Sequence, residues 1–498
     1  MNEIYFIDQT LRDAHQSLWA TRMTTAMMLP IAPIINEAGY KAIEFMGVVQ
    51  FDACLRYLRE DPWERIRLLH KAMPNTLLGA AFRSEGLTRF DIVPDSVVYL
   101  WIKRLAANGI RNLCIMDSFH DWDNIAEYVN VAKAEGLEMK IPLVFCESPV
   151  HTDEYYAQKT AELIKQLKPD EVYIKDPMGV ITPERVRTLV PAIQKELQGL
   201  PLELHSHCTT GLAPLCYLEA MKLGVKTFHT AVSPLANGSS QPSIENIIKN
   251  ARRLGFTPVI NEKAVEAESA HFRYVAKREG KPLGAPVEYD VFQYLHQVPG
   301  GMITNLKFML SQRKMEGRLD EVLEEIARIR VEWGYPIMVT PFSQIVGTQA
   351  VLNLVSRERY SIAPQETIMY MLEFYGKAPA PIDLNVKDKI LSLLEAKDFL
   401  NWKPPQPSIE ELRKEMGRPG ISDDELLLRI LFTQEHVDAT LAAGPMKTSY
   451  PRGDKPIIAL IQELKNRKNF TYIKIQKGDF SLTVQNSTPN PHSQGDGV

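Results

Sequence analysis

Eight short apolar runs alternate with longer amphipathic stretches through the first half of the chain, roughly 25 to 38 residues apart. The runs are IYFID (4–8), AIEFMG (42–47), LLGAAFR (77–83), NLCIMD (112–117), IPLVF (141–145), EVYIKD (171–176), LELHSH (202–207) and TFHTAVS (227–233). Repeated strand–helix alternation predicts an α/β fold with a parallel sheet, and eight such units predict a (β/α)8 TIM barrel. An open doubly wound sheet is the alternative, which the absence of a glycine-rich loop after the first run disfavours.

Polar side chains collect at the points where these runs end. They are Asp13 just past the first run, Arg83 after the third, Asp117 after the fourth, Lys175 and Asp176 after the sixth, and His205 and His207 after the seventh. The active site of a TIM barrel lies at the carboxyl ends of its strands. Polar groups that gather there from separate strands are hard to attribute to packing, so we expect the active site at this end.

The seventh run carries two histidines that are candidates for metal binding. In LELHSHCTTG, His205 and His207 stand two positions apart. Residues i and i+2 of a strand share a face, so both imidazoles point toward one place. A lone His-x-His pair is weak evidence for a metal, and two polar residues on an ordinary strand are the alternative.

The character of the chain changes after about residue 300. Helical periodicity without strand alternation predicts a barrel domain over 1–300 and an all-helical domain over 301–442. Turn-forming residues indicate a linker over 443–456, followed by a helix and then a strand over 457–485. The tail 486–498 has too few apolar residues to pack and is expected to be disordered.

Composition narrows the class of protein further. The 498 residues are 45% hydrophobic with a net charge of −4, so neither nucleic acid nor an anionic membrane is indicated as a partner. The first residues lack the pattern of a signal peptide, and no uninterrupted apolar stretch is long enough to span a membrane. The five cysteines form no C-x-x-C pair and are expected to be reduced and mostly buried. We therefore expect a cytoplasmic protein.

Several motifs resemble those of the biotin-dependent carboxyltransferases. This family includes the carboxyltransferase domain of pyruvate carboxylase, the α subunit of oxaloacetate decarboxylase and the central subunit of transcarboxylase. The matching segments are DQTLRDAHQSLWATR (8–22), FDACLRYLREDPWERI (51–66), YIKD (173–176), HSHCTTG (205–211), VPGGMITNL (298–306) and VTPFSQIVGTQAV (339–351). The resemblance implies that the protein moves a carboxyl group between carboxybiotin and a 2-oxo acid through a metal-stabilised enolate.

The resemblance also implies a set of metal ligands. Carried over from the family, they are Asp13, a Lys175 carboxylated on its ε-nitrogen, His205 and His207, and they bind a divalent metal, usually zinc. Two imidazoles and two oxygen ligands suit zinc, manganese or cobalt, whereas an uncarboxylated lysine is a poor ligand. The alternatives are a salt bridge between Lys175 and Asp176, and a helix N-cap role for Asp13.

The same comparison implies the residues that handle the substrate. Arg12, Gln16 and Arg83 correspond to family residues that bind the 2-oxo acid, and the planar guanidinium of arginine fits a carboxylate or an enolate oxygen. Surface salt bridging is the alternative for either arginine. Thr340 corresponds to the threonine that carries a proton between biotin and the methyl carbon of pyruvate. Thr-Pro before an apolar-periodic stretch is also typical of a helix N-cap followed by proline.

Departures from the family leave the substrate open. After the second run the chain reads EFMGVVQ (44–50) where the family commonly has E-x-W-G-G-A-T, and Ser84 and Pro177 also differ from the family pattern. These positions are expected to line the pocket. Pyruvate is therefore the default 2-oxo acid, and another enolisable acceptor is the alternative.

No biotin carboxylase and no biotinyl domain is present in the sequence, so carboxybiotin is expected from a separate carrier. The expected partners are a biotin carboxyl carrier protein and biotin carboxylase subunits, and a homodimer is expected by analogy with the family. Residues 457–485 resemble the segment that precedes the biotinyl domain in such carriers, and a simple structural appendage is the alternative. A metal-dependent aldolase or lyase without biotin, and a non-catalytic scaffold, are the rival functions.

Overall fold

A closed barrel of eight parallel strands forms the first half of the chain in the computed structural model, which describes residues 2–84, 87, 90, 92–312, 314–451, 472–477 and 480–485. The strands are β1 (Glu3–Asp8), β2 (Ala42–Gly47), β3 (Leu78–Arg83), β4 (Asn112–Met116), β5 (Glu138–Val144), β6 (Glu171–Asp176), β7 (Leu202–Ser206) and β8 (Thr227–Thr230). Closure is made by β1, where Ile7 pairs with Ala42 of β2 and with His229 of β8. The predicted TIM barrel is confirmed.

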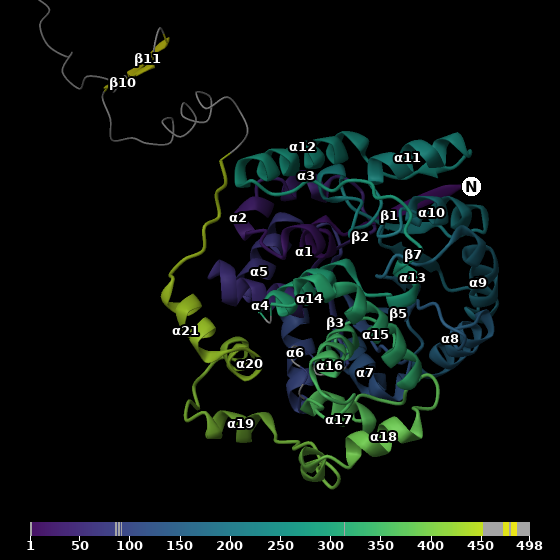
Figure 1. Ribbon diagram of the computed structural model, residues 1–498. Coiled ribbons are helices and arrows are strands. Elements are labelled where there is room, and N and C mark those ends of the chain that lie inside the picture. The colour runs from purple at the N-terminus through teal and green to yellow at the C-terminus, as the bar shows by residue number, and fades with distance from the viewer. Residues whose placement is uncertain are drawn as a thin grey trace, which may run out of the picture. The chain divides into compact units, whose positions relative to one another are not determined.

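Helices follow the strands in chain order and surround the barrel (Figure 1). They are α1 (His15–Trp19), α2 (Thr25–Met28), α3 (Ala32–Asn36), α4 (Val48–Ala53), α5 (Pro62–Ala72), α6 (Asp95–Asn108), α7 (Ala126–Ala134), α8 (Asp153–Leu167), α9 (Pro183–Glu196), α10 (Ala213–Lys222), α11 (Ile244–Arg253) and α12 (Glu262–Glu279). A two-residue strand, β9 (Thr257–Pro258), pairs with the start of β1. The short turn η1 (Thr10–Ala14) leads out of β1 and carries candidate site residues.

Side-chain caps define where several outer helices begin. Asp61, Thr152, Thr182, Ser243 and Asn261 each accept a hydrogen bond from a backbone N–H in the first turn of α5, α8, α9, α11 and α12. Each cap satisfies a donor that the helix cannot pair internally. The helices that cover the barrel are therefore specified locally as well as by their apolar faces.

The region after residue 290 is helical, and its first helices pack on the carboxyl end of the barrel. Its helices are α13 (Gln293–His296), α14 (Gly300–Gln312), α15 (Leu319–Glu332), α16 (Phe342–Val355), α17 (Gln365–Met371), α18 (Leu384–Leu391), α19 (Ile409–Glu415), α20 (Asp423–Leu431) and α21 (Gln434–Ala442). Phe342 of α16 lies 4.3 Å from Phe119, between ring centroids, in the loop after β4. Arg330 of α15 donates to the carbonyl of Glu147, after β5, at 3.3 Å. Figure 1 shows α14, α15 and α16 across the barrel strands.

The chain divides into two compact units, 1–449 and 450–498. The barrel and the helical region belong to the same unit, and the boundary lies inside the predicted linker 443–456. In the second unit, β10 (Tyr472–Lys477) and β11 (Phe480–Gln485) pair antiparallel, with Ile473 opposite Val484. Two strands are thus present where the sequence predicted one. The predicted helix within 457–471 and the predicted disordered tail 486–498 lie outside the described residues.

Two further expectations from composition can be compared with the structure. All five cysteines are free and buried, as expected. Within the described part of the chain, the helices are too short or too polar for any of them to cross a bilayer.

Candidate metal and carboxyl-transfer site

Asp13, His205 and His207 form a buried cluster at the carboxyl end of the barrel. Asp13 lies in η1, His205 lies on β7, and His207 is the first residue beyond that strand. Asp13 Oδ2 is 3.3 Å from His205 Nε2 and 3.2 Å from His207 Nε2. The three ligand atoms lie within 4.8 Å of one another, and the described residues offer no second group of this kind. One carboxylate and two imidazoles are donors that zinc, cobalt and manganese accept.

The protonation states of the cluster suit a cation. Burial lowers the pKa of His205 to about 3, so its ring is neutral at pH 7. His207 Nδ1 donates to the carbonyl of Ser239 at 2.6 Å, which leaves the Nε2 lone pair facing Asp13. Burial alone would raise the pKa of Asp13, but Arg12 and the histidines hold it well below its usual range. Metal ligands must be a deprotonated carboxylate and neutral imidazoles, and Asp13 and His205 meet that requirement.

Gln241 marks the place where the ligand atoms converge, and sequence reasoning missed it. Its Nε2 is 3.1 Å from Asp13 Oδ2, 3.0 Å from His207 Nε2 and 3.4 Å from His205 Nε2. The amide nitrogen of Gln241 therefore lies at the point that all three candidate ligand atoms face. Its hydrogens carry partial positive charge, and a bound cation would take the same place. The only sequence signal was its position in the loop after the eighth strand.

Lys175 lies on β6 beside the cluster. It is the register partner of His205 on β7, and it is buried. Asp176 is engaged by the loops instead of by this lysine, because its carboxylate accepts from the backbone N–H groups of Val180 and Ile181, both at 3.0 Å, and from Ser206 Oγ at 2.7 Å. Among the described residues Lys175 forms no salt bridge with Asp176, so the structural alternative left open by the sequence is not what the fold uses.

Arg12 is held inside the barrel by two carboxylates. Its Nε donates to Glu44 Oε2 at 2.9 Å, and one terminal nitrogen donates to Asp13 Oδ2 at 3.2 Å. Burial opposes the charge of Arg12, but these two carboxylates raise its pKa. Burial would raise the pKa of Glu44, and the surrounding positive charges, Arg12 foremost, lower it to about 2. Arg12 is therefore a fixed, desolvated cation next to the metal cluster, and the surface salt-bridge alternative is wrong for it.

Gln16 and Arg83 occupy neighbouring parts of the same end. Gln50 of α4 donates to Gln16 Oε1 and to the backbone carbonyl of Arg12, each at 3.2 Å, so the two glutamine side chains lie beside the backbone of η1. Arg83 ends β3, is buried, and has its guanidinium carbon 5.9 Å from the ring centre of Phe90. Gln50 is one of the departures from the family pattern that the sequence placed in the pocket, but no role was predicted for it.

Asp117, which the sequence placed among the polar strand ends, serves the loop that follows β4. Its carboxylate accepts from Ser84 Oγ at 2.8 Å and Asn124 Nδ2 at 3.0 Å, and from the backbone N–H groups of Phe119 and Asp121, both at 2.9 Å. These hydrogen bonds occupy both oxygens of the Asp117 carboxylate. Asp117 therefore shapes the barrel mouth and supplies no ligand to the cluster.

Thr340 immediately precedes α16 and is half-buried. Pro341 occupies the N-cap position, and no side chain caps the helix there. The N-cap role that the sequence left open for Thr340 is therefore wrong. Phe342 packs on Phe119, so the segment that carries Thr340 is seated on a loop of the barrel mouth.

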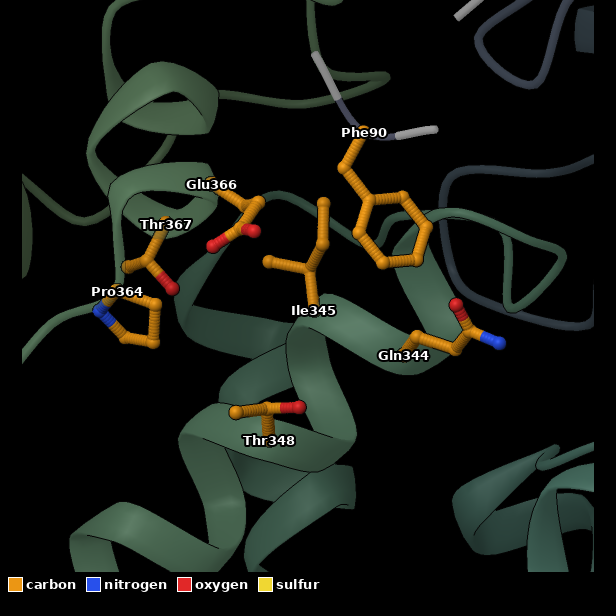
Figure 2. A pocket seen from close by; sticks show the side chains of 7 residues that line it. All are labelled: Phe90, Gln344, Ile345, Thr348, Pro364, Glu366 and Thr367. Carbon is orange, nitrogen blue, oxygen red and sulfur yellow. The ribbon is translucent and has the colours of Figure 1, made fainter. Parts of the chain in front are cut away.

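A pocket of about 100 Å³ opens on α16 (Figure 2). It is lined by Phe90, Gln344, Ile345, Thr348, Pro364, Glu366 and Thr367. Figure 2 shows the Phe90 ring and the Ile345 side chain close together at one side of it. None of the lining residues belongs to the metal cluster, so this pocket is separate from the metal ligands and adjoins the helix that follows Thr340.

Comparisons with known proteins cover most of the chain. Residues 3–270 match the family described as HMGL-like, and residues 294–470 match the conserved carboxylase domain. A pyruvate carboxylase subunit from Methanocaldococcus jannaschii is 38% identical over 441 residues, which are 86% of this chain and 76% of that protein. The 2-oxoglutarate carboxylase large subunit of Hydrogenobacter thermophilus is 32% identical over 448 residues, 88% of this chain and 68% of that protein.

A solved structure agrees with the sequence relatives. The carboxyl transferase domain of Rhizobium etli pyruvate carboxylase, determined with oxamate and biotin, superimposes with a TM-score of 0.78 at 25% identity. The match covers 89% of this chain and 78% of that one. The fold and the buried Asp–His–His cluster agree with relatives that are similar over most of the chain. The chain therefore belongs to the carboxyltransferase family of the biotin-dependent 2-oxo-acid carboxylases.

Proposed function

We propose that this enzyme transfers a carboxyl group between carboxybiotin and a 2-oxo acid, with pyruvate and oxaloacetate as the substrate pair. The observation that carries the proposal is the buried cluster of Asp13, His205 and His207 next to the desolvated cation of Arg12. An enolate needs positive charge fixed around its oxygen before it forms. A divalent metal held by the cluster would supply that charge together with the arginine, at one end of a barrel whose relatives are carboxylases.

Asp13, Lys175, His205 and His207 would hold the divalent metal, for which we propose zinc. A bound dication supplies Lewis-acid stabilisation of negative charge on the substrate oxygen. Lys175 would join the ligand set as its carbamate, which supplies an anionic oxygen ligand, whereas an ammonium group has no lone pair. Its burial beside His205, without an ion pair to Asp176, supports this assignment.

The remaining residues would bind the substrate and move a proton. Arg12, Gln16 and Arg83 would hold the carboxylate and the 2-oxo oxygen, since the guanidinium groups carry paired donors in one plane. Thr340 would pass a proton between the ureido nitrogen of biotin and the methyl carbon of pyruvate. The helical region that covers the carboxyl ends of the strands would keep water from the enolate.

Two properties of the assembly belong to the same proposal. Two relatives are named as single subunits of carboxylases, so we propose separate biotin carboxylase and biotin carrier subunits as partners. The homodimer stays a prediction. Five buried, unpaired cysteines support the cytoplasm as the compartment, since thiols are kept reduced there.

Free biotin should make the purified protein release CO₂ from oxaloacetate. The expected result is decarboxylation of oxaloacetate, labelled in the carboxyl group to be transferred, that rises with biotin and saturates. A metal-dependent lyase would cleave its substrate at the same rate without biotin. Biotin-independent release would therefore overturn the proposal and favour that rival function.

The acceptor is tested by the same assay. A relative at 32% identity is named a 2-oxoglutarate carboxylase, and the positions after the second strand depart from the family pattern, so 2-oxoglutarate is the second candidate. Gly47 lies under Arg12, where an added Cβ would come within 2.9 Å of Gln50 Oε1 and 3.1 Å of the Ala81 carbonyl. Running pyruvate and 2-oxoglutarate in parallel in the carboxylation direction, with carboxybiotin, identifies the acceptor by the larger kcat/KM.

Deleting residues 452–498 should separate chemistry from carrier delivery. Every proposed site residue belongs to the first compact unit, which ends at Ser449. We expect the shortened protein to keep its biotin-dependent decarboxylation and to lose transfer from the natural carrier. A chain lacking only 486–498 is the control and should keep both activities. An equal loss of both activities in the longer deletion would show that the segment is an internal structural element.

A further inference from the structure

His229, on β8, lies directly behind His205 in the barrel interior. The ring is fully buried, and its Nδ1 is 3.2 Å from His205 Nδ1. On its other side, His229 Nε2 is 3.0 Å from Glu203 Oε2. The ring of Tyr173 stacks on His229 with centroids 5.0 Å apart and an interplanar angle of 18°, so the imidazole plane is fixed.

Gln9 reveals which nitrogen of His229 carries the proton. Gln9 Oε1 accepts from a terminal nitrogen of Arg12 at 3.0 Å, and a guanidinium can only donate. The amide nitrogen of Gln9 must therefore face His229 Nδ1, at 2.9 Å, as a donor. His229 Nδ1 is thus an acceptor, and its Nε2–H donates to Glu203.

Glu203 is anchored by two lysines, of which Lys140 is fully buried. Its carboxylate is 2.8 Å from Lys140 Nζ and 3.2 Å from Lys41 Nζ, and neither Glu203 nor Lys140 is exposed. A buried ion pair is costly and is seldom the most stable way to fill a core. Most interior positions of a TIM barrel hold branched apolar side chains. A charged group kept here behind a histidine therefore points to a role in the site.

We propose that His229 is a positioning residue for the metal ligand His205. Because His229 Nδ1 accepts, its 3.2 Å contact with His205 is favourable when His205 directs Nδ1–H toward the lone pair that it shares with Gln9, and the Nε2 lone pair of His205 then faces Asp13 and His207. Glu203 fixes the tautomer of His229 from behind. Glu203, His229 and His205 thus form a series of hydrogen bonds that orients His205 toward the proposed metal. Hydrogen-bond partners of metal-bound histidines have this role in other proteins. The inference rests on the proposed metal site.

Two replacements of the same shape test the inference. His229→Leu removes the acceptor, whereas His229→Asn places an amide oxygen close to the former Nδ1. Zinc affinity is measured by competition with a chromophoric chelator, and the thermal midpoint is measured on the metal-free proteins. We expect His229→Leu to weaken zinc binding by about 10- to 100-fold. His229→Asn should recover most of that loss, with similar midpoints for the two metal-free variants.

The outcomes separate this inference from the metal site itself. His271→Leu is the control, because the His271 ring bonds the backbone carbonyl of Met27 and lies away from the cluster. It should bind zinc like the unmodified protein. Equal affinity in the unmodified protein and in His229→Leu would overturn the positioning role, as would an equal loss in both His229 variants. Failure of the unmodified protein to bind zinc would instead overturn the proposed metal site.

Discussion

Replacing His207 with alanine should remove the metal and the carboxyltransferase activity together. The His207 Nε2 lone pair faces Asp13, and the ring is held there by its bond to the Ser239 carbonyl. Losing one of four ligands leaves a dication with too few donors to be retained at the low concentrations of free zinc in a cell. Lewis-acid stabilisation contributes several kcal/mol, and about 4 kcal/mol corresponds to a rate loss of about a thousandfold.

Elemental analysis and the biotin-dependent decarboxylation assay check this prediction. The unmodified protein should hold about one zinc per chain, whereas His207→Ala should hold almost none. His271→Ala is the matched control, since it also removes one histidine bond to a backbone carbonyl but lies outside the cluster. If His207→Ala kept both its metal and its activity, His207 would not be a ligand. Zinc below stoichiometry in the unmodified protein, with no gain on reconstitution, would reject the whole ligand set.

Replacing Thr340 with alanine should abolish carboxyl transfer while leaving the metal and the fold in place. The hydroxyl caps no helix, because Pro341 takes the N-cap position of α16. The expected stability change is therefore within about 0.5 kcal/mol, the usual range for a position without such a structural role. A positioned proton carrier contributes about 10²- to 10⁴-fold to a rate, and the loss should fall in that range.

Thr340→Ser is the conservative control, because serine keeps a hydroxyl on the same carbon. It should retain much of the activity that Thr340→Ala loses, with the same zinc content in both. Retained activity in Thr340→Ala would remove the proton-carrier role. A fall in the unfolding free energy of about 1 kcal/mol together with retained activity would instead restore the N-cap interpretation, against the geometry seen at Pro341.

The sequence predicted the structure correctly where a local residue pattern is compatible with only one type of structure. Apolar runs that alternate with amphipathic stretches predicted all eight barrel strands to within a few residues of their observed bounds. The His-x-His pair on the seventh run predicted two imidazoles near one spot, and their ring centroids are 5.2 Å apart. Strand periodicity depends on neighbouring residues alone, and the position of a barrel's site at its strand ends is a general rule. Both can therefore be applied without knowledge of the tertiary structure.

Two local residue patterns were each compatible with more than one structural role, and the tertiary packing determined which role was adopted. Thr-Pro before an apolar stretch fits an N-cap, but the helix begins two residues after Thr340, at Phe342. Asp117 and Asp176 end strands just as Lys175 does, yet backbone N–H groups of the following loops occupy both carboxylates. The hydrogen-bond partner of a polar side chain at a strand end depends on the conformation of the following loop. The spacing of residues in the sequence does not determine that conformation.

Only barrel closure brought the remaining site residues together. Gln9, Glu203 and His229 are far apart in the sequence, and they meet because β1 pairs with β8 and β8 with β7. Glu203 lies on β7 and Lys140 on β5, and the sequence does not show whether such a charged side chain points inward or outward. That direction follows from the strand register around the closed sheet, which the whole barrel sets at once. The strands and the metal-binding motif were therefore readable from the sequence, whereas the hydrogen-bonded groups that orient the motif were decided by the tertiary structure.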